Sequence, residues 1–298
     1  MIESQESITA KLCAFARAWH SRQEGSRIFD DDLAYDLIGE EEYSQMYSLI
    51  RSGFDGSSHY SPQETEQIIR TYMAPIPLSR LPFCEGSLAG FAAEYGNIQY
   101  VICGAGSDTF SFRNKNRRIE VYEADHPDTQ AAKLAKIRSL GWQPGRNVHF
   151  VSVDFEKERM SEKLLAAGFD PAKKSFFSIL GVTYYLTLDV FTETLSQIAD
   201  ISSPESALVF DYPQRTGKFP ERVKKLSEIT ALLGEEMRGG YDYQEVSRAL
   251  YSLGFQVDTY LSPVGVQRQY FDGRSDGMRA FENVNLLSAV FTGGYDFE

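Results

Sequence analysis

Residues 101–109 read Val-Ile-Cys-Gly-Ala-Gly-Ser-Asp-Thr, an apolar run that stops at a Gly-x-Gly turn. Gly104 and Gly106 can adopt backbone angles that are closed to other residues, and they let the main chain approach a ligand closely. A second apolar run ends at Asp125, 21 positions after Gly104, where a carboxylate is placed to accept hydrogen bonds from ribose hydroxyls. Together these features predict a site for a nucleotide-type cofactor, which dehydrogenases and methyltransferases share.

The chain after residue 96 alternates between short β-rich runs and helical segments. Strands are expected at residues 98–103, 119–124, 148–153, 176–180 and 207–210, and helices at residues 129–140, 158–167 and 187–201. This alternation is typical of a parallel sheet with helices on both faces, in which ligands bind at the carboxyl ends of the strands. Two more expected strands, 255–261 and 285–292, have only residues 263–271 and a Gly-rich loop between them, which fits an antiparallel last strand. The expected fold class is therefore α/β, with a mostly parallel sheet of seven strands.

The first 96 residues show a different pattern. Helices are expected at residues 7–20, 30–38, 40–51 and 88–95, and a further helix begins where Ser61 is followed by Pro62 and Glu64. No clear strand is found in this part. We expect a helical N-terminal region, 1–96, packed on a cofactor-binding domain, 97–298, in which the segment 213–243 is a candidate lid over the ligand.

Composition excludes several classes of partner. The chain has 298 residues and a formal net charge of −12, so its long-range field repels nucleic acid and anionic membrane surfaces. Its three cysteines, Cys13, Cys84 and Cys103, lack metal-site spacing and are expected to be reduced. The sequence begins without the pattern of a secretory signal, and no apolar run is long enough to span a membrane. A cytoplasmic protein without a metal site is expected.

The motifs resemble those of a known family, the class I S-adenosylmethionine-dependent methyltransferases of the leucine carboxyl methyltransferase type. These include bacterial O-methyltransferases associated with polyketide-type metabolites. The resemblance covers most of the chain, and Gly-Ala-Gly-x-Asp-Thr followed by Arg113 is much more specific than a bare Gly-x-Gly. The other matching segments are Phe15-Ala16-Arg17-Ala18, Ile28-Phe29-Asp30-Asp31, Leu78 to Phe83, Glu123 to Pro127, Val153-Asp154-Phe155, Gly168 to Pro171 and Tyr185-Leu186.

The resemblance implies a Rossmann-like methyltransferase fold, S-adenosylmethionine as the cofactor, and roles for single residues. The turn of Gly104, Ala105 and Gly106 is similar to the turn that approaches the methionine part of the cofactor. Asp125 resembles the ribose-binding acid. The Asp154 side chain and the Phe155 backbone resemble the pair that recognises adenine, and Arg80 resembles an arginine that binds the cofactor carboxylate.

One position departs from the family pattern. Members often have Glu-Gly after the fourth strand, where this chain has Leu180-Gly181. Leu180 lacks a carboxylate, although its backbone carbonyl can still accept from the cofactor ammonium group. At the same end of the sheet, Tyr184, Tyr185 and Asp211 are candidates for lining the site of the methyl acceptor. The acceptor is expected to be a carboxylate or hydroxyl oxygen of a small molecule.

Several roles stay open at this level. Asp108 and Thr109 either cap the helix after the turn or touch the ligand, and Arg113 either binds an anion or pairs with Asp108 or another acid. His126 is a structural histidine or, as a weaker alternative, a general base; no catalytic residue is nominated. An NAD-dependent oxidoreductase is disfavoured because Thr109 stands where the dinucleotide fingerprint has a third glycine. A non-catalytic protein that binds S-adenosylmethionine remains the other alternative, since Leu180 replaces an acid.

Overall fold

A single seven-stranded sheet organises the computed structural model, which describes residues 7–155, 157–215 and 219–293. The strands are β1 (Ile98–Cys103), β2 (Ile119–Asp125), β3 (Val148–Ser152), β4 (Ser175–Ile179), β5 (Ala207–Pro213), β6 (Phe255–Leu261) and β7 (Val284–Phe291). Their order is β3-β2-β1-β4-β5-β7-β6. Strand β7 is antiparallel to both of its neighbours, and the other strand pairs are parallel. The predicted α/β class and antiparallel last strand are confirmed.

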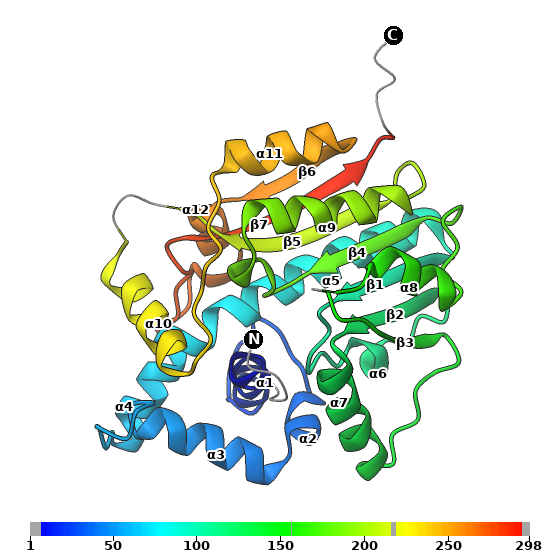
Figure 1. Cartoon of the computed structure of the whole chain (residues 1–298). Helices are drawn as coiled ribbons and strands as arrows, with labels where there is room; N and C mark the ends of the chain where they lie inside the picture. Colours follow the sequence, from blue (N-terminus) through cyan, green and yellow to red (C-terminus); the bar gives the residue numbers. More distant parts are fainter. Residues whose placement is uncertain (1–6, 156, 216–218, 294–298) are drawn as a thin grey trace.

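Both faces of the sheet are buried because alternate residues of each strand enter different hydrophobic clusters. In β1, Tyr100 and Ile102 belong to the cluster that also contains the N-terminal helices, whereas Val101 and Cys103 point to the opposite cluster. The opposite face is covered by α8 (Met160–Ala166), α9 (Leu188–Asp200) and α11 (Tyr243–Ser252). Figure 1 shows α9 and α11 on one side of the sheet and the N-terminal helices on the other.

The remaining helices form the N-terminal region or lie in the connections between strands. They are α1 (Ile8–Ser21), α2 (Ala34–Ile38), α3 (Glu40–Arg51), α4 (Pro62–Ile68), a π-helical turn η1 (Ile69–Met73), α5 (Pro75–Tyr95), α6 (Phe110–Arg113), α7 (Pro127–Ser139), a 3₁₀ turn η2 (Thr183–Tyr185), α10 (Glu221–Leu232), α12 (Pro263–Val266) and a second π-helical turn η3 (Gln267–Phe271). Ser61 caps α4, and its hydroxyl and the Glu64 side chain form a reciprocal capping box. Among the described residues, no helix is both long enough and apolar enough to cross a membrane.

Helix α5 is the largest departure from the sequence-based expectation, which placed a helix only at residues 88–95. The helix begins 13 residues earlier, at Pro75, and contains Pro82. Pro75 is tolerated because the first helical N–H groups have no partner, and Ser79 donates its hydroxyl to the Pro75 carbonyl at 2.9 Å. Prolines usually end helices, so the sequence pattern hides this one.

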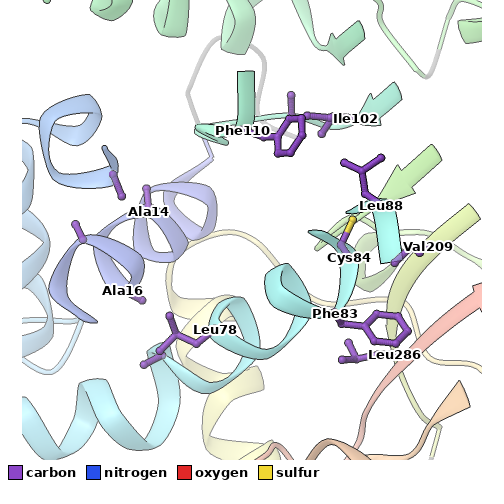
Figure 2. Packing of buried hydrophobic residues seen from close by; sticks show 14 of the residues in the cluster. Ala14, Ala16, Leu78, Phe83, Cys84, Leu88, Ile102, Phe110, Val209 and Leu286 are labelled. Carbon is purple, nitrogen blue, oxygen red and sulfur yellow. The ribbon is translucent and has the colours of Figure 1, made fainter. Parts of the chain in front are cut away.

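Tertiary burial explains why α5 persists despite Pro82. Figure 2 shows Leu78, Phe83, Cys84 and Leu88 of this helix lying between Ala14 and Ala16 of α1 and the sheet residues Ile102, Val209 and Leu286. The helix is buried along most of its length, and this burial outweighs the lost backbone hydrogen bond. Smaller differences are that the helix expected at 30–38 begins at Ala34, that the helix expected after the glycine turn is the four-residue α6, and that α11 had no sequence-based counterpart.

The candidate lid, residues 213–243, contains α10 and is held to the body of the protein at both ends. Residues 216–218 lie outside the described part of the chain. Gln214 and Tyr241 form a parallel bridge that joins the two ends of the segment to each other. Arg222 attaches the segment to the rest of the protein by donating to the carbonyls of Thr71, Arg279 and Ala280 at 2.8–2.9 Å. The Tyr241 hydroxyl donates to the carbonyl of Leu186 at 2.8 Å. Whether this segment opens during function stays a prediction.

His20 is a buried group whose protonation opposes folding. Its side chain is 2% exposed, and Nε2 accepts the backbone N–H of Ile28 at 2.9 Å, so the folded protein holds a neutral ring. Burial, reinforced by the nearby charge of Arg274, lowers the pKa of His20 from 6.5 to about 4.

We predict that this histidine makes stability depend on pH. Because the folded pKa lies below the unfolded one, the contribution is complete above pH 6.5 and is lost as the pH falls toward 4. Between pH 7.5 and 5 the free energy of unfolding should fall by about 2 kcal/mol more in the wild type than in His20→Gln. Glutamine can accept from Ile28 without titrating, and urea denaturation of both proteins measures the difference. Equal pH dependence in the two proteins would contradict this account.

Candidate functional site

Four predicted site residues lie in one row across the sheet because the strand register places them there. Cys103 is paired with both Ala124 and Ile179, and Ile179 is paired with Phe210. The residue that follows each of these paired residues therefore lies at the carboxyl edge of the sheet. These residues are Gly104, Asp125, Leu180 and Asp211. In parallel sheets this edge is where ligands bind.

The glycine turn after β1 has the geometry that the sequence predicts. Gly104 and Gly106 have φ of 75° and 49°, and the Gly104 N–H continues the ladder by donating to the Ala124 carbonyl at 2.8 Å. A Cβ atom at Gly104 would lie 2.7 Å from Cγ2 of Val182, in the loop after β4. Glycine is thus required at residue 104 both for backbone angle and for space.

Asp125 lies at the end of β2, directly beside this turn. One carboxylate oxygen accepts the N–H of Gly106 in a short hydrogen bond, and the other accepts the N–H of His126 at 2.7 Å. Burial raises the pKa of Asp125 above its ordinary value, and the two N–H donors partly offset this shift. A carboxylate has about four acceptor positions, so the two backbone bonds orient Asp125 and leave capacity for a ligand's hydroxyls.

Asp154 and Phe155 follow β3 at the neighbouring position of the same edge. The Asp154 carboxylate is 2.9 Å from Nζ of Lys157 and 4.0 Å from Nε2 of His126. The ring of Phe155 is 42% exposed. His126 itself caps α7, accepting the Asp128 N–H on Nδ1. The structure therefore brings the predicted adenine-binding pair near Asp125.

Arg80 reaches this edge from α5 and lies beside the β4 and β5 ends. Its Nη1 is 3.4 Å from Oδ2 of Asp211, and its Nε has no hydrogen-bond partner among the described residues. A Cβ at Gly181 would lie 2.5 Å from Nη1, so the guanidinium rests directly on this glycine. Burial lowers the pKa of Arg80, whereas the negative charge of Asp211 raises it. Together with smaller contributions from its other neighbours, this leaves the pKa above its ordinary value. The arginine therefore stays a cation.

Asp211 and Tyr184, predicted to line the acceptor site, make their hydrogen bonds inside the protein. The two carboxylate oxygens of Asp211 accept from the Gly181 N–H at 2.7 Å and the Tyr184 hydroxyl at 2.8 Å. Burial, followed by the Asp211 charge, raises the pKa of Tyr184 well above its ordinary value. These two residues hold Arg80 and the loop after β4 in place.

Tyr185 faces the N-terminus of α1 and the candidate lid, in a cluster that sequence reasoning missed. Its hydroxyl is 2.8 Å from Oγ1 of Thr9, which donates a short hydrogen bond to Glu235. Glu235 also accepts from the Ser7 hydroxyl at 2.8 Å. Glu235 comes from the 213–243 segment, and no sequence periodicity connects it to residues 7–9. The position of Glu235 beside the N-terminus of α1, which favours a carboxylate, arises only in the folded protein, so the sequence carries no signal for this contact.

The open roles of Asp108, Thr109 and Arg113 are accounted for by internal contacts. Asp108 accepts the Phe110 N–H at 2.6 Å, as a turn-capping residue does. Thr109 is 1% exposed, donates to Asp31 at 2.7 Å and accepts from Arg113 at 2.8 Å. Arg113 also makes a forked pair with Glu85, at 3.0 and 2.6 Å, rather than with Asp108.

Leu180 stands at the row position where the family pattern has an acid. Its side chain is half-buried against the cluster beneath the N-terminal helices. Gly181 follows with φ of 73°, so the chain turns sharply here. The expected contact between the Leu180 carbonyl and the cofactor stays a prediction.

Comparison with known proteins identifies the class. The family model of leucine carboxyl methyltransferase matches residues 10–199. YktD of Bacillus subtilis (strain 168), provisionally named an S-adenosyl-L-methionine-dependent methyltransferase, is 34% identical over 304 residues, covering 97% of this chain and 99% of that protein. A protein of Mycobacterium avium (strain 104) with the same provisional name is 28% identical over 237 residues, covering 78% of this chain and 76% of its own.

Two solved structures share the fold. One is a provisionally named methyltransferase of Thermobifida fusca YX, with a TM-score of 0.53, 16% identity, and coverage of 83% of this chain and 94% of that one. The other is a DUF574 family protein of Streptomyces avermitilis MA-4680, with a TM-score of 0.54, 14% identity, and coverage of 81% and 95%.

Fold and relatives together define an S-adenosylmethionine-dependent methyltransferase, and S-adenosylmethionine is its cofactor. Within that class, the chain belongs to the leucine carboxyl methyltransferase family. The resemblance stated from the motifs is confirmed.

We predict that Gly104→Ala lowers the free energy of unfolding by more than backbone strain alone would. Gly141 has φ of 69°, close to that of Gly104, but a Cβ there meets nothing within 4 Å. Gly141→Ala should therefore report strain alone, of about 1 kcal/mol. Gly104→Ala should lose a further 1–3 kcal/mol, roughly, through overlap with Val182. Urea denaturation measures both, and equal losses would show that Val182 yields without cost.

We also predict that Asp125→Ala weakens S-adenosylmethionine binding by roughly 5- to 150-fold, equivalent to about 1–3 kcal/mol, because ligand hydroxyls lose their acceptor. Asp128→Ala is the matched control, since that carboxylate lies three residues away and its side chain is 61% exposed. Isothermal titration calorimetry on both variants gives the affinities. Unchanged affinity in a folded Asp125→Ala protein would show that the site lies elsewhere.

Proposed function

We propose that the protein transfers the methyl group of S-adenosylmethionine to a carboxylate or hydroxyl oxygen of a small molecule, at the carboxyl edge of β1, β2, β4 and β5. The observation that carries this proposal is the row of Gly104, Asp125, Leu180 and Asp211, which the strand register brings together. Arg80 adds a buried cation to the same edge.

The residues at this edge fit the cofactor. Gly104 has no Cβ, which lets the main chain approach a ligand closely, and Asp125 keeps free acceptor capacity. The buried Nε of Arg80, unpartnered among the described residues, points to an anion that this guanidinium would bind, and the cofactor carries a carboxylate. Asp154 and the Phe155 backbone would hold the adenine, and Ala105, Gly106 and Leu180 would supply backbone contacts.

Little covalent assistance is needed from the protein. The cofactor supplies an electrophilic methyl group on a cationic sulfur. The chain's own contribution is to hold the acceptor oxygen in line and to exclude water, so that the oxygen sheds its solvation. Burial raises the pKa of Tyr185, as it does that of Tyr184, so neither phenol takes a proton at neutral pH. A carboxylate acceptor is already ionised and needs no base, whereas a hydroxyl acceptor would need one.

The acceptor would be enclosed by Tyr185 and the segment 213–243. Arg238 and Gly239 donate their N–H groups to the Tyr184 carbonyl at 2.9 and 2.7 Å, which sets this segment over the loop after β4. Tyr184 and Asp211 line the same wall while supporting Arg80. The segment would act as a lid, and it would have to break several of these hydrogen bonds to open.

The cellular setting proposed is the cytoplasm. Cys13, Cys84 and Cys103 are free, and burial raises the pKa of Cys103 to about 12. A net charge of −12 disfavours nucleic acid and anionic membranes as partners and is compatible with a small-molecule acceptor.

Transfer of a labelled methyl group tests the proposed reaction. The full chain is incubated with S-adenosylmethionine tritiated on the methyl group and with a low-molecular-mass metabolite extract, and the labelled products are separated. Strong base then releases volatile methanol from a carboxyl methyl ester but not from a methyl ether, which distinguishes the two oxygen acceptors. Asp125→Ala should transfer little label, and Asp128→Ala should transfer as much as the wild type.

Three outcomes of that experiment would overturn the proposal. Label absent from every small molecule, but present on macromolecules when a macromolecular extract is supplied instead, would exclude a small-molecule acceptor. Label shown by mass spectrometry to lie on nitrogen or carbon would exclude O-methylation. No transfer from any extract, with cofactor binding intact, would favour a non-catalytic binding protein.

A further inference from the structure

A buried arginine on the first helix contacts the glycine turn through its backbone. Nη2 of Arg17 donates to the carbonyl of Ser107 at 2.6 Å, and Nε donates to Oδ2 of Asp31 at 2.8 Å. The side chains of Arg17 and Asp31 are 7% and 1% exposed. A charged side chain in a helix whose other buried residues are mostly apolar is costly unless its donors are used, and here two of them are.

Asp31 fixes this arginine because its second oxygen is also engaged. Oδ1 accepts the Thr109 hydroxyl at 2.7 Å and lies 3.3 Å from Nε of Arg113, whose terminal nitrogens fork onto Glu85. Burial by itself would raise the pKa of Asp31, but Arg17 and Arg113 hold it below its ordinary value. Two cations and two carboxylates thus balance in one buried network, which joins α1, α5 and α6 to the turn.

The turn is held from two opposite sides. The Gly106 N–H donates to Asp125 on the β2 side, and the Ser107 carbonyl accepts from Arg17 on the α1 side. Asp108 closes the turn internally by donating its N–H to the Ala105 carbonyl at 2.8 Å. The orientation of the peptide after Ser107 therefore depends on Arg17, and that peptide is next to the residue that contacts the predicted ribose acceptor.

From these contacts, we propose that Arg17 is a positioning residue for the cofactor: by holding the Ser107 carbonyl, it presets the Gly104–Gly106 turn before the cofactor binds. The inference rests on the proposed cofactor site at this turn. A preset turn loses less conformational freedom on binding, so the effect appears in cofactor affinity. Arg17 itself touches neither cofactor nor acceptor in this role.

The test compares Arg17→Lys with Arg274→Lys. A lysine at residue 17 keeps the charge beside Asp31, but its single ammonium cannot reproduce the fork that also reaches Ser107. Arg274 is the matched control because it likewise pairs with an aspartate, Asp276, through Nε at 3.1 Å and donates from Nη2 to a backbone carbonyl, that of Ser26 at 3.0 Å, away from the turn. Calorimetric titration with S-adenosylhomocysteine, at a temperature where each variant is folded, gives the dissociation constants.

A second measurement reports the conformation of the glycine turn in the ligand-free protein. Labelling alanine with ¹³C at the carbonyl and glycine with ¹⁵N selects the Ala-Gly pairs, which in this sequence end at Gly90, Gly106 and Gly168. The two remote glycines serve as internal references for the Gly106 amide signal. A merely structural loss of stability leaves this signal in place in the folded protein.

We expect Arg17→Lys to raise the dissociation constant about tenfold or more and to shift the Gly106 amide. Arg274→Lys should stay within twofold of the wild type and leave that amide unchanged. A dissociation constant within twofold in Arg17→Lys, or an unmoved Gly106 signal, would overturn the proposal. Failure of the wild type to bind S-adenosylhomocysteine would instead refute the proposed cofactor site, and the Gly106 signal would still decide the role of Arg17.

Discussion

The parallel pairing of β1 with both β2 and β4 is the constraint on which the site depends. One register brings Gly104, Asp125 and Leu180 to the same edge, and the pairing of β4 with β5 adds Asp211. A slip of one residue in either pairing would send the side chains of that strand to the opposite face. The register is protected because both faces of β1 are buried, each in its own hydrophobic cluster.

Ion pairs between buried side chains fix the geometry of the site that the strand register establishes. Several charged side chains lie at or under the edge, and each buried cation has a carboxylate close by: Arg80 with Asp211, and Arg17 and Arg113 with Asp31. Such pairs are weak sources of net stability, but breaking one leaves an uncompensated buried charge. Their role here is therefore to fix geometry around the turn and the loop after β4.

Much of this arrangement could be predicted from the sequence, and the limits have physical causes. The glycine turn and Asp125 were predicted because strand periodicity and glycine angles are local properties of the chain. Helix α5 was underestimated because Pro82 is a local breaker, whereas burial between α1 and the sheet is a tertiary effect. The contacts of Arg17 and Glu235 were missed for the same reason, since they join residues 90 and 226–228 positions apart.

The bond between Glu235 and the start of α1 has a consequence for how the chain is made. Arg80, the glycine turn, Asp125 and Asp211 all precede residue 212, so a nascent chain of that length already contains them. Glu235, the partner of Ser7 and Thr9, is synthesised more than two hundred residues after them. During synthesis on the ribosome, these residues are therefore all present before the residue that joins α1 to the candidate lid has been added.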